Sequence, residues 1–248
     1  MYQLSYYGIA NFRIQFEDGR NILIDPYFGL SGKTWEDMPK INYLVVSHGA
    51  GDHLGDSLDI LKRDRCPFIA GNGVLEYAKL KGAVTDNGYV MVQGAPRQFE
   101  DIHFKALQAI HLSMINLGNG VFISDPPLGY IITLPDGLKI YHPGDTALFG
   151  DMKIIGELYK PDVMLLPVGM MPGAVTEMGP EEAAIAAEWI RPKVVVPIHY
   201  DIVEQKDYPD ILKEHLAVRA PYIKMRKMEV DETMPISKEL VEKGLQRA

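Results

Sequence analysis

Residues 45–56, VVSHGAGDHLGD, place His48, Asp52 and His53 on one glycine-rich stretch directly after an apolar run. Neutral imidazole and carboxylate groups are the ligands that zinc, iron and manganese take from proteins. Three such groups on one short loop indicate part of a metal site. Ala50, two residues after His48, has no side-chain atom that could bind a metal. The loop therefore raises the question of whether one ligand is missing.

Other histidines and acids follow other predicted strands. His111, Asp145 and His199 each come at or just after the end of an apolar, β-branched segment. Ligands gather where strand ends open into loops, because a rigid sheet positions the side chains that the loops carry. With the first three residues they give six candidate ligands from four segments, which suits a pair of metal ions better than one.

The remaining polar candidates have weaker patterns. His103 in DIHFKAL and His215 in KEHL are expected to be structural or surface residues. His142, three residues before Asp145, is expected to orient a ligand rather than bind metal itself. Asp25, which precedes Pro26, could do the same or could simply end a strand.

The loop around His48 needs a strand to position it. FRIQF (12–16) and NILID (21–25) flank an Asp-Gly turn, which predicts a hairpin. INYLVV (41–46) is too short for a helix and too uniformly apolar for a one-sided strand, so it predicts a central strand ending at the loop. After the loop, Leu54, Leu58 and Leu61 have the spacing of one buried helical stripe.

A similar order returns after residue 130. IITLPDGLKIYHPGD (131–145) again sets two strands around Asp-Gly, and DVMLLPVG (162–169) predicts another central strand before a glycine loop. GPEEAAIAAEWIRP (179–192) predicts a helix, because Pro180 suits the first turn and Pro192 follows the stop. KVVVPIHYD (193–201) predicts a buried strand that ends at His199. Two related β-rich halves of an α/β protein are therefore expected.

Composition limits the class of protein. The 248 residues are 47% hydrophobic and 23% charged, as in soluble globular proteins. A formal net charge of -8 argues against a nucleic-acid-binding protein. Cys66 is the single cysteine, so a reducing compartment is expected. The N-terminus lacks a signal-peptide pattern and no apolar run reaches spanning length. We expect a cytoplasmic protein with no membrane partner.

Four segments taken together carry a family resemblance. HGAGDH (48–53), AIHLS (109–113), YHPGDT (141–146) and PIHYD (197–201), in this order, resemble the metallo-β-lactamase-fold hydrolases, in particular those similar to ascorbate-6-phosphate lactonase. LIDPYF (23–28) and MGPEEAAIAAEWI (178–190) match as well. The resemblance implies an α/β fold, an αββα sandwich of two mixed β-sheets flanked by helices. We expect one domain over residues 1–222 and a strand/helix extension over 223–248, packed on this domain or on a neighbouring subunit of a homo-oligomer.

The resemblance also implies a ligand set for two divalent ions, Zn, Mn or Fe. The first ion would take His48, a histidine at position 50, and His111, and the second would take Asp52, His53 and His199. Asp145 would bridge both ions, and Asp52 would also accept or return a proton. Because residue 50 is alanine, the first site is expected to be weakened or empty, since even residues behind the ligands change affinity by roughly 10–100-fold.

Ala50 admits two explanations. A natural variant would work with one ion, or would have lost catalysis and become a metal- or ligand-binding protein. An introduced alanine would cripple a hydrolase while preserving its fold. We favour the introduced change, since the other six positions are intact. In either case the chain is expected to be impaired.

The expected reaction is hydrolysis of a small-molecule substrate by a metal-bound hydroxide. A lactone is favoured by the resemblance, and a phosphodiester is the alternative on the same site. Residues 112–130, with Met114 and Asn116, and residues 169–175, with Met170 and Met171, are expected to line the pocket. The two latter methionines could equally fill gaps in the core. Neither segment carries an Arg or Lys cluster, which counts against a phosphate group.

Overall fold

The chain forms two compact units, each containing one seven-stranded mixed sheet. The computed structural model describes residues 1–171, 177–201 and 205–245. Unit 1 comprises Met1–Gln93, Leu112–Leu128 and Glu229–Pro235, and unit 2 comprises Gly94–His111, Gly129–Met228 and Ile236–Ala248. Two mixed sheets with helices confirm the predicted fold class.

The sheet of unit 1 carries the predicted hairpin and the predicted central strand. Its order is β16 (Thr233–Ile236), β1 (Tyr2–Tyr6), β2 (Phe12–Phe16), β3 (Asn21–Ile24), β4 (Tyr43–Val45), β5 (Phe68–Ala70) and β6 (Gly88–Val90). β2 and β3 pair antiparallel across the Asp-Gly turn, and β4 lies between β3 and β5 with parallel partners on both sides. All three residues of β4 are buried, as its uniformly apolar sequence predicts.

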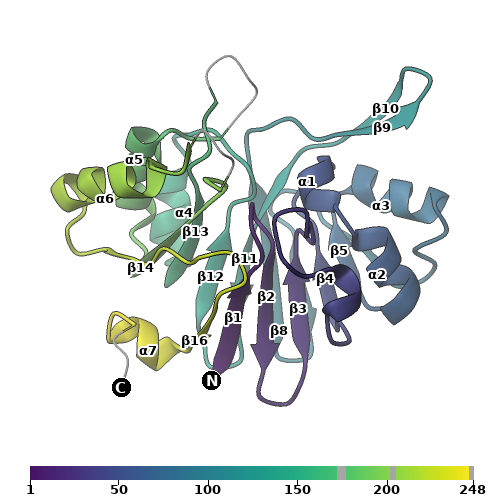
Figure 1. The fold of residues 1–248 in the computed structure, drawn as a ribbon, viewed down its shortest axis with the longest axis horizontal. Helices are drawn as coiled ribbons and strands as arrows, with labels where there is room; N and C mark the ends of the chain where they lie inside the picture. Colours follow the sequence, from purple (N-terminus) through teal and green to yellow (C-terminus); the bar gives the residue numbers. More distant parts are fainter. Residues whose placement is uncertain (172–176, 202–204, 246–248) are drawn as a thin grey trace. The chain divides into compact units, whose positions relative to one another are not determined.

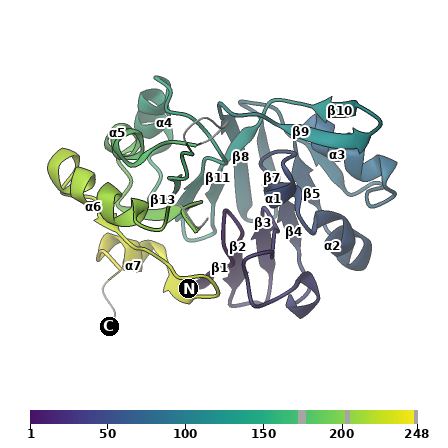
Figure 2. The same ribbon diagram turned by 45° about the horizontal axis from the view of Figure 1, so that its top comes forward.

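Short helices pack beside this sheet. They are a 3-10 helix (Trp35–Asp37), α1 (Gly51–Leu54), α2 (Ser57–Asp64) and α3 (Asn72–Leu80), and α2 and α3 lie near β4 and β5 in Figures 1 and 2. The predicted stripe was wrong at its first position. Leu54 belongs to α1, because the chain turns at Gly55, and α2 buries Ile60 together with Leu61 while Leu58 is only partly buried. These side chains join one apolar core with Leu44 and Phe68.

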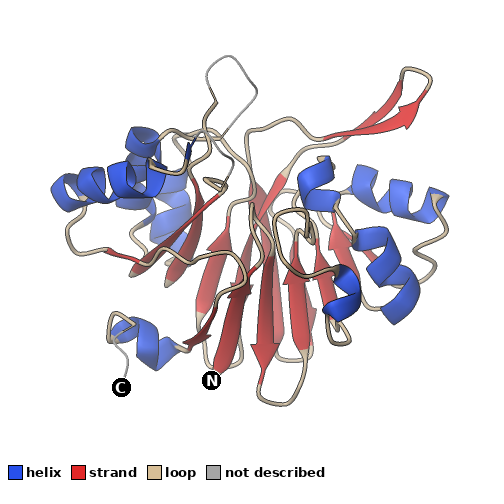
Figure 3. Cartoon of the chain, viewed as in Figure 1, coloured by secondary structure: helices blue, strands red, loops and turns tan. Residues whose placement is uncertain are grey.

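Residues 112–130, which were expected to line the pocket, contain a two-stranded arm. β9 (Met114–Gly118) and β10 (Val121–Ser124) pair antiparallel, apart from the seven-stranded sheet (Figure 3). Asn119 and Gly120 both have positive φ, which is the backbone of a tight two-residue hairpin turn.

The sheet of unit 2 carries the second hairpin and both later strands. Its order is β15 (Lys224–Met225), β14 (Val194–Ile198), β13 (Val163–Pro167), β12 (Lys139–His142), β11 (Leu128–Thr133), β8 (Ile102–Gln108) and β7 (Pro96–Phe99). β12, β13 and β14 run parallel, so their carboxyl ends lie at one edge. Asp145 follows β12 and His199 follows β14, which brings both residues to that edge.

Helices α4 (Met152–Tyr159), α5 (Pro180–Ile190) and α6 (Tyr208–Arg219) lie together beside β13 (Figures 1 and 2). Pro180 occupies the first turn of α5, as predicted, and four of its alanines are fully buried, which lets α5 approach its neighbours closely. The core of unit 2 includes Tyr141, Met164 and Ile190.

The last described residues supply one strand to each sheet, β16 and β15, and a short helix, α7 (Lys238–Glu242). The helix is the one predicted for the tail. Lys238 at its start contacts Asp162 at 2.6 Å. Among the described residues, no helix combines the length and apolar character needed to cross a bilayer.

Candidate metal centre

The backbone conformations of Ala50 and Gly55 set the shape of the loop after β4. Ala50 is extended and precedes α1, so Asp52 and His53 fall in a single helical turn. The turn ends at Gly55, which has φ +43°. A Cβ atom at this position would lie 2.3 Å from the carbonyl oxygen of Pro26, closer than real atoms approach. Only glycine therefore lets α1 end this close to the segment after β3.

Asp25 contacts Ser47 and His53 of this loop and orients His53. Its Oδ1 accepts a hydrogen bond from the backbone N–H of Ser47 at 2.7 Å, and its Oδ2 accepts from the Ser47 hydroxyl at 2.7 Å. Oδ2 also lies 2.8 Å from Nδ1 of His53. An ionised carboxylate can only accept, so Nδ1 of His53 carries the proton. The lone pair of His53 is therefore on Nε2, the atom that a metal would use.

The same reasoning fixes the tautomer of His48. The hydroxyl of Ser47 has one proton and gives it to Asp25, so it accepts from Nδ1 of His48 at 3.0 Å. His48 therefore also has its lone pair on Nε2. The two rings lie 4.2 Å apart between centroids, and both are buried. Unit 1 thus presents two neutral imidazoles whose orientation is set by buried hydrogen bonds.

A second set of contacts ties the loop to the arm. The N–H of Gly49 donates to Oγ of Ser113 at 3.1 Å, and Ser113 donates to Asp125 at 2.7 Å. Asp125 also accepts from the N–H of Gly73 at 2.8 Å, at the start of α3. The ends of the segment 112–130 are therefore hydrogen-bonded both to the histidine loop and to a helix of the same unit.

In unit 2, His111 and Asp145 are brought together by backbone pairing. The Thr146 hydroxyl accepts from the N–H of Ile110 at 2.9 Å, and the N–H of Ala147 donates to the Ile110 carbonyl at 2.9 Å. These bonds place His111 beside Asp145, with His111 Nε2 at 3.8 Å from Asp145 Oδ2. Asp145 is buried and His111 partly buried.

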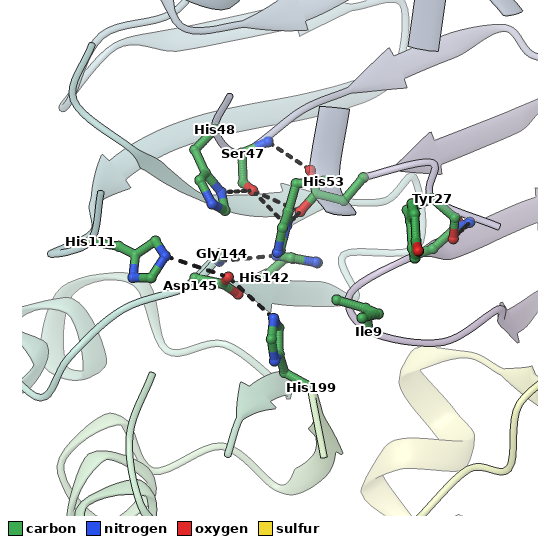
Figure 4. Close-up of polar contacts among 12 residues, drawn as sticks. Ile9, Tyr27, Ser47, His48, His53, His111, His142, Gly144, Asp145 and His199 are labelled. Carbon is green, nitrogen blue, oxygen red and sulfur yellow. Dashed lines mark hydrogen bonds and ion pairs between the residues drawn. The ribbon is translucent and has the colours of Figure 1, made fainter. Parts of the chain in front are cut away.

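His142 shapes the turn that precedes Asp145. Its Nδ1 accepts a hydrogen bond from the N–H of Gly144 at 3.0 Å, which puts its own proton on Nε2 (Figure 4). This is the opposite tautomer to that of His48 and His53. The contact supports the predicted role of His142 in positioning Asp145, a role that stays a prediction.

His199 directly follows β14 in a left-handed conformation, with φ +65°, which is rare for a residue with a side chain. Its Nε2 lies 3.4 Å from Asp145 Oδ2, and its Nδ1 lies 3.5 Å from Glu177 Oε2. A Cβ atom on Gly169 would lie 2.6 Å from that Nδ1 and 2.7 Å from that carboxylate. The glycine therefore leaves room for the histidine and the glutamate side by side.

The donor sets fit a divalent metal ion. Distances of 3.4 and 3.8 Å around Asp145 exceed those of hydrogen bonds. They match ligands that share an ion, because donors about 2.1 Å from a tetrahedral metal lie roughly 3.4 Å from one another. Ligand atoms of His111, Asp145 and Glu177 also fall within 4.8 Å of each other. Buried carboxylates are stable when they are paired or bind metal.

The predicted residues thus fall into two sets. Unit 1 holds His48, Asp52 and His53, with Asp25 in contact with His53, and unit 2 holds His111, Asp145 and His199, with His142 beside the Asp145 turn. Ala50 precedes α1 without a side-chain hydrogen bond to the helix. That these residues bind metal stays a prediction, as does the proton transfer assigned to Asp52.

The four residues predicted to bind substrate lie on exposed or partly exposed segments. Met114 is exposed on β9, and Asn116 accepts a hydrogen bond from the N–H of Gly118 in the arm. Met170 and Met171 are half-buried, and a Cβ on Gly179 would lie 3.2 Å from the end of Met170, so Met170 covers the start of α5. Residues 172–175 of the predicted 169–175 lining lie outside the described residues.

Sequence reasoning missed three residues that contact the candidate ligands or their loop. Ser47 adjoins His48 in the sequence, and a hydroxyl beside a candidate ligand could have been noticed. Ser113 follows His111 by two residues. Glu177 precedes the predicted helix and has no pattern that distinguishes it from a residue of the helix start.

Comparison with known proteins identifies the family of the chain. The model of the Beta-lactamase superfamily domain matches residues 20–200. A UPF0173 metal-dependent hydrolase from Geobacillus thermodenitrificans is 39% identical over 204 residues, 80% of this chain and 85% of that protein.

Solved structures give the same answer for the fold. Igni18, a metallo hydrolase from Ignicoccus hospitalis, is 30% identical with a TM-score of 0.78, over 95% of this chain and 99% of that one. The metallo-beta-lactamase fold protein YhfI from Bacillus subtilis has a TM-score of 0.70 at 13% identity, over 94% of this chain and 98% of that one. The chain belongs to the UPF0173 family of metal-dependent hydrolases, in the beta-lactamase superfamily.

Proposed function

We propose that the chain hydrolyses a small cyclic ester, a lactone, with divalent metal ions bound by its histidine and aspartate sets. The observation that carries the proposal is the orientation of the buried donors. Asp25 and Ser47 turn the lone pairs of His48 and His53 onto Nε2, and His111 and His199 approach one carboxylate, Asp145, at ligand spacing. Histidines and acids with purely structural roles would not need their donor atoms held in this way in both units.

A pocket beside the histidine loop suits a small substrate. Unit 1 contains a pocket of about 500 Å³, within the usual size of small-molecule sites. Gly51 of α1 and Gly55 directly after it form part of its wall, and aromatic side chains, including Tyr27 and Trp35, form another part. The charged side chains of this lining are Lys33, Glu36 and Asp56. Two acids and one base fit a neutral cyclic ester better than an anionic phosphodiester.

The chain's own residues then have distinct tasks. A bound divalent ion supplies a Lewis acid and lowers the pKa of water. Asp25 keeps His53 in one tautomer, and Ser47 does so for His48. Asp52, half-buried in the first turn of α1, is the group proposed to take a proton and return it to the leaving oxygen. No serine or cysteine nucleophile is required.

Ala50 is proposed to weaken the first metal site, since its methyl group supplies no ligand. Ala50→His should raise both metal affinity and turnover. Unchanged metal stoichiometry and unchanged rates in this variant would show that residue 50 is not a ligand position.

The test of the proposed reaction is a substrate panel on protein of known metal content. Protein is stripped with a chelator and reloaded separately with Zn²⁺, Mn²⁺ or Fe²⁺. Metal content is then measured, and hydrolysis is followed with γ- and δ-lactones and with a phosphodiester. Metal-dependent lactone hydrolysis that is lost in Asp52→Asn supports the proposal.

Three results would overturn it. Protein that binds none of the three metals would exclude the metal-dependent mechanism for this chain. Metal-loaded protein that cleaves only the phosphodiester would assign the alternative substrate class, and metal-loaded protein that cleaves neither would favour a binding protein.

A further inference from the structure

Glu177 is a buried acid that the predicted ligand set does not include. It lies just before α5, and its side chain is 4% exposed. Its carboxylate and one ligand atom each of His111 and Asp145 all lie within 4.8 Å of one another. These three residues belong to unit 2 and come from three separate segments, the connection after β8, the turn after β12 and the approach to α5. Two buried carboxylates this close to histidines form a favourable environment for a cation.

The backbone leaves space for this carboxylate. Gly169, just after β13, approaches Glu177 Oε2 so closely that an added Cβ would be 2.7 Å away. The same Cβ would be 2.5 Å from the carbonyl oxygen of His199. Any other residue at 169 would displace either the glutamate or the end of β14. The position of Glu177 is therefore fixed by close packing on the residue that follows a central strand.

Glu177 adds a third donor to two predicted ligands of the same unit. The resemblance implies His111 and Asp145 as ligands, and the carboxylate of Glu177 lies beside both within unit 2. A second carboxylate makes this ligand set richer in oxygen, which shifts preference from zinc toward Mn²⁺.

We infer that Glu177 is a metal ligand of this chain, completing a site with His111 and Asp145 in unit 2. This inference rests on the proposed function, because it assumes that the chain binds metal. It predicts that the donors of unit 2 hold an ion in the chain as it stands.

The first experiment measures metal binding by the full chain. Glu177→Gln keeps the shape of the side chain and removes its charge, and Glu177→Ala removes the group. Mn²⁺ affinity and stoichiometry are measured by calorimetry and by the electron paramagnetic resonance of free and bound Mn²⁺. Both variants should lose one equivalent of Mn²⁺ or bind it more than about 100-fold more weakly, beyond the usual effect of residues behind the ligands. Glu181→Gln, an exposed carboxylate on α5, is the matched control and should leave binding unchanged.

The second experiment separates a ligand from a residue that only orients His199. Glu177→Ala is compared in the unaltered chain and in His199→Ala. Loss of a residue that acts only by orienting His199 has no effect once that histidine is removed, whereas loss of a ligand still weakens Mn²⁺ binding by His111 and Asp145. A double-mutant cycle of this kind measures the coupling of the two residues.

The outcomes are distinguishable. Unchanged Mn²⁺ binding in Glu177→Gln would overturn the inference. An effect of Glu177→Ala that disappears in the His199→Ala background would assign Glu177 to positioning His199, and would also overturn it. Circular dichroism of each metal-free variant checks that the fold is retained. Absence of metal binding in the unaltered chain would instead refute the proposed function.

Discussion

The two units hold their candidate ligands in different ways. In unit 1, Asp25, Ser47 and His53 are joined by buried contacts of 2.7 to 2.8 Å, and His48 adds one of 3.0 Å. In unit 2, the contacts among the ligand side chains are longer, 3.4 Å from Asp145 to His199 and 3.8 Å to His111. The first set has hydrogen-bond distances, and the second has the spacing of donors around an ion.

The difference assigns different physical roles to the two sets. The histidines of unit 1 are oriented by hydrogen bonds that also contribute to folding, so changes there should affect both stability and metal affinity. The side chains of unit 2 are brought together by backbone geometry, at Thr146 and at the left-handed His199. Changes to these side chains should lower metal affinity with little loss of stability in the metal-free protein. Buried carboxylates that lie close together repel each other, so removing one charge also removes that repulsion.

The largest effect is expected for Asp145→Asn. The substitution removes the carboxylate that both His111 and His199 approach, and an amide is a weak metal ligand. Metal affinity should fall by more than about 100-fold, and lactone hydrolysis should fall with it. The free energy of unfolding of the metal-free protein should stay the same or rise. Calorimetric metal titration and urea unfolding measure the two quantities.

Asp136→Asn is the matched control for Asp145→Asn, since Asp136 is an exposed acid of the same unit in the β11–β12 turn. It should leave metal affinity unchanged. A loss of metal-free stability in Asp145→Asn of the size predicted next for Asp25 would contradict the distinction between the units.

Asp25→Ala should give the next largest effect and should change both quantities. It leaves the backbone N–H and hydroxyl of Ser47 and Nδ1 of His53 without their acceptor in a buried site. The free energy of unfolding should fall by about 1–3 kcal/mol. Metal affinity should fall by about 10–100-fold, the usual effect of losing a group that orients a ligand.

The chain offers a reporter for each unit in this experiment. Trp35 lies in unit 1 and Trp189 in unit 2, and they are its two tryptophans. Each of the two variants, Trp35→Phe and Trp189→Phe, keeps a single tryptophan. The tryptophan fluorescence of each variant therefore follows the unfolding of one unit. Asp25→Ala should lower the transition that Trp35 reports. An effect seen only through Trp189 would contradict the assignment of Asp25 to the stability of unit 1.

Much of the fold could be predicted because its main strands are apolar and are bounded by Asp-Gly turns. β4 and β13 are fully buried, so their uniform hydrophobicity was informative. The arm at 114–124 was predictable in principle from Asn119-Gly120, yet the glycines and prolines around it resemble an irregular connection. The break between α1 and α2 depends on a close approach of Gly55 to Pro26. Such long-range contacts leave no periodic pattern.

The candidate ligands could be predicted from their order, whereas their partners could not. Asp25 was considered because it precedes a proline, but its contacts reach residues more than 20 positions away. Glu177 resembles any acid near a helix start. Left-handed backbone at Asp25 and His199 is also invisible in sequence, since neither is glycine. Side chains that orient ligands are selected by tertiary packing, so a structure was needed to find them.

A smaller difference in metal affinity should distinguish the loss of two hydroxyl groups, that of Ser47 in unit 1 and that of Thr146 in unit 2. Ser47 contacts His48 and Asp25 directly, whereas Thr146 contacts only backbone atoms of Ile110 and Ala147. Ser47→Ala and Thr146→Val should each lower stability by about 1 kcal/mol, the typical value of one hydrogen bond. Only Ser47→Ala should weaken metal binding directly through the tautomer of His48. Equal losses of metal affinity would show that backbone pairing near His111 matters as much as ligand orientation.

The smallest effect is a pH dependence confined to the core of unit 1. Burial, and next the nearby Asp64, raise the pKa of the Cys66 thiol to about 12, from an ordinary value of 9.0. The folded state therefore keeps this proton while the unfolded chain loses it. The contribution to stability is fully present below pH 9 and is lost as the pH rises toward 12, by up to about 1.4 kcal/mol per pH unit. The unaltered chain should lose stability relative to Cys66→Ala between pH 9 and pH 10, as measured by urea unfolding. Because Cys66 lies in unit 1, the loss should appear through Trp35 before it appears through Trp189.

Burial likewise raises the pKa of Tyr141 in unit 2, but a phenol begins to titrate at higher pH than a thiol. A simultaneous loss through both reporters would mean that the two units unfold as one cooperative structure. The stability changes predicted for Asp25 and Asp145 would then appear as changes in the free energy of unfolding of the whole chain.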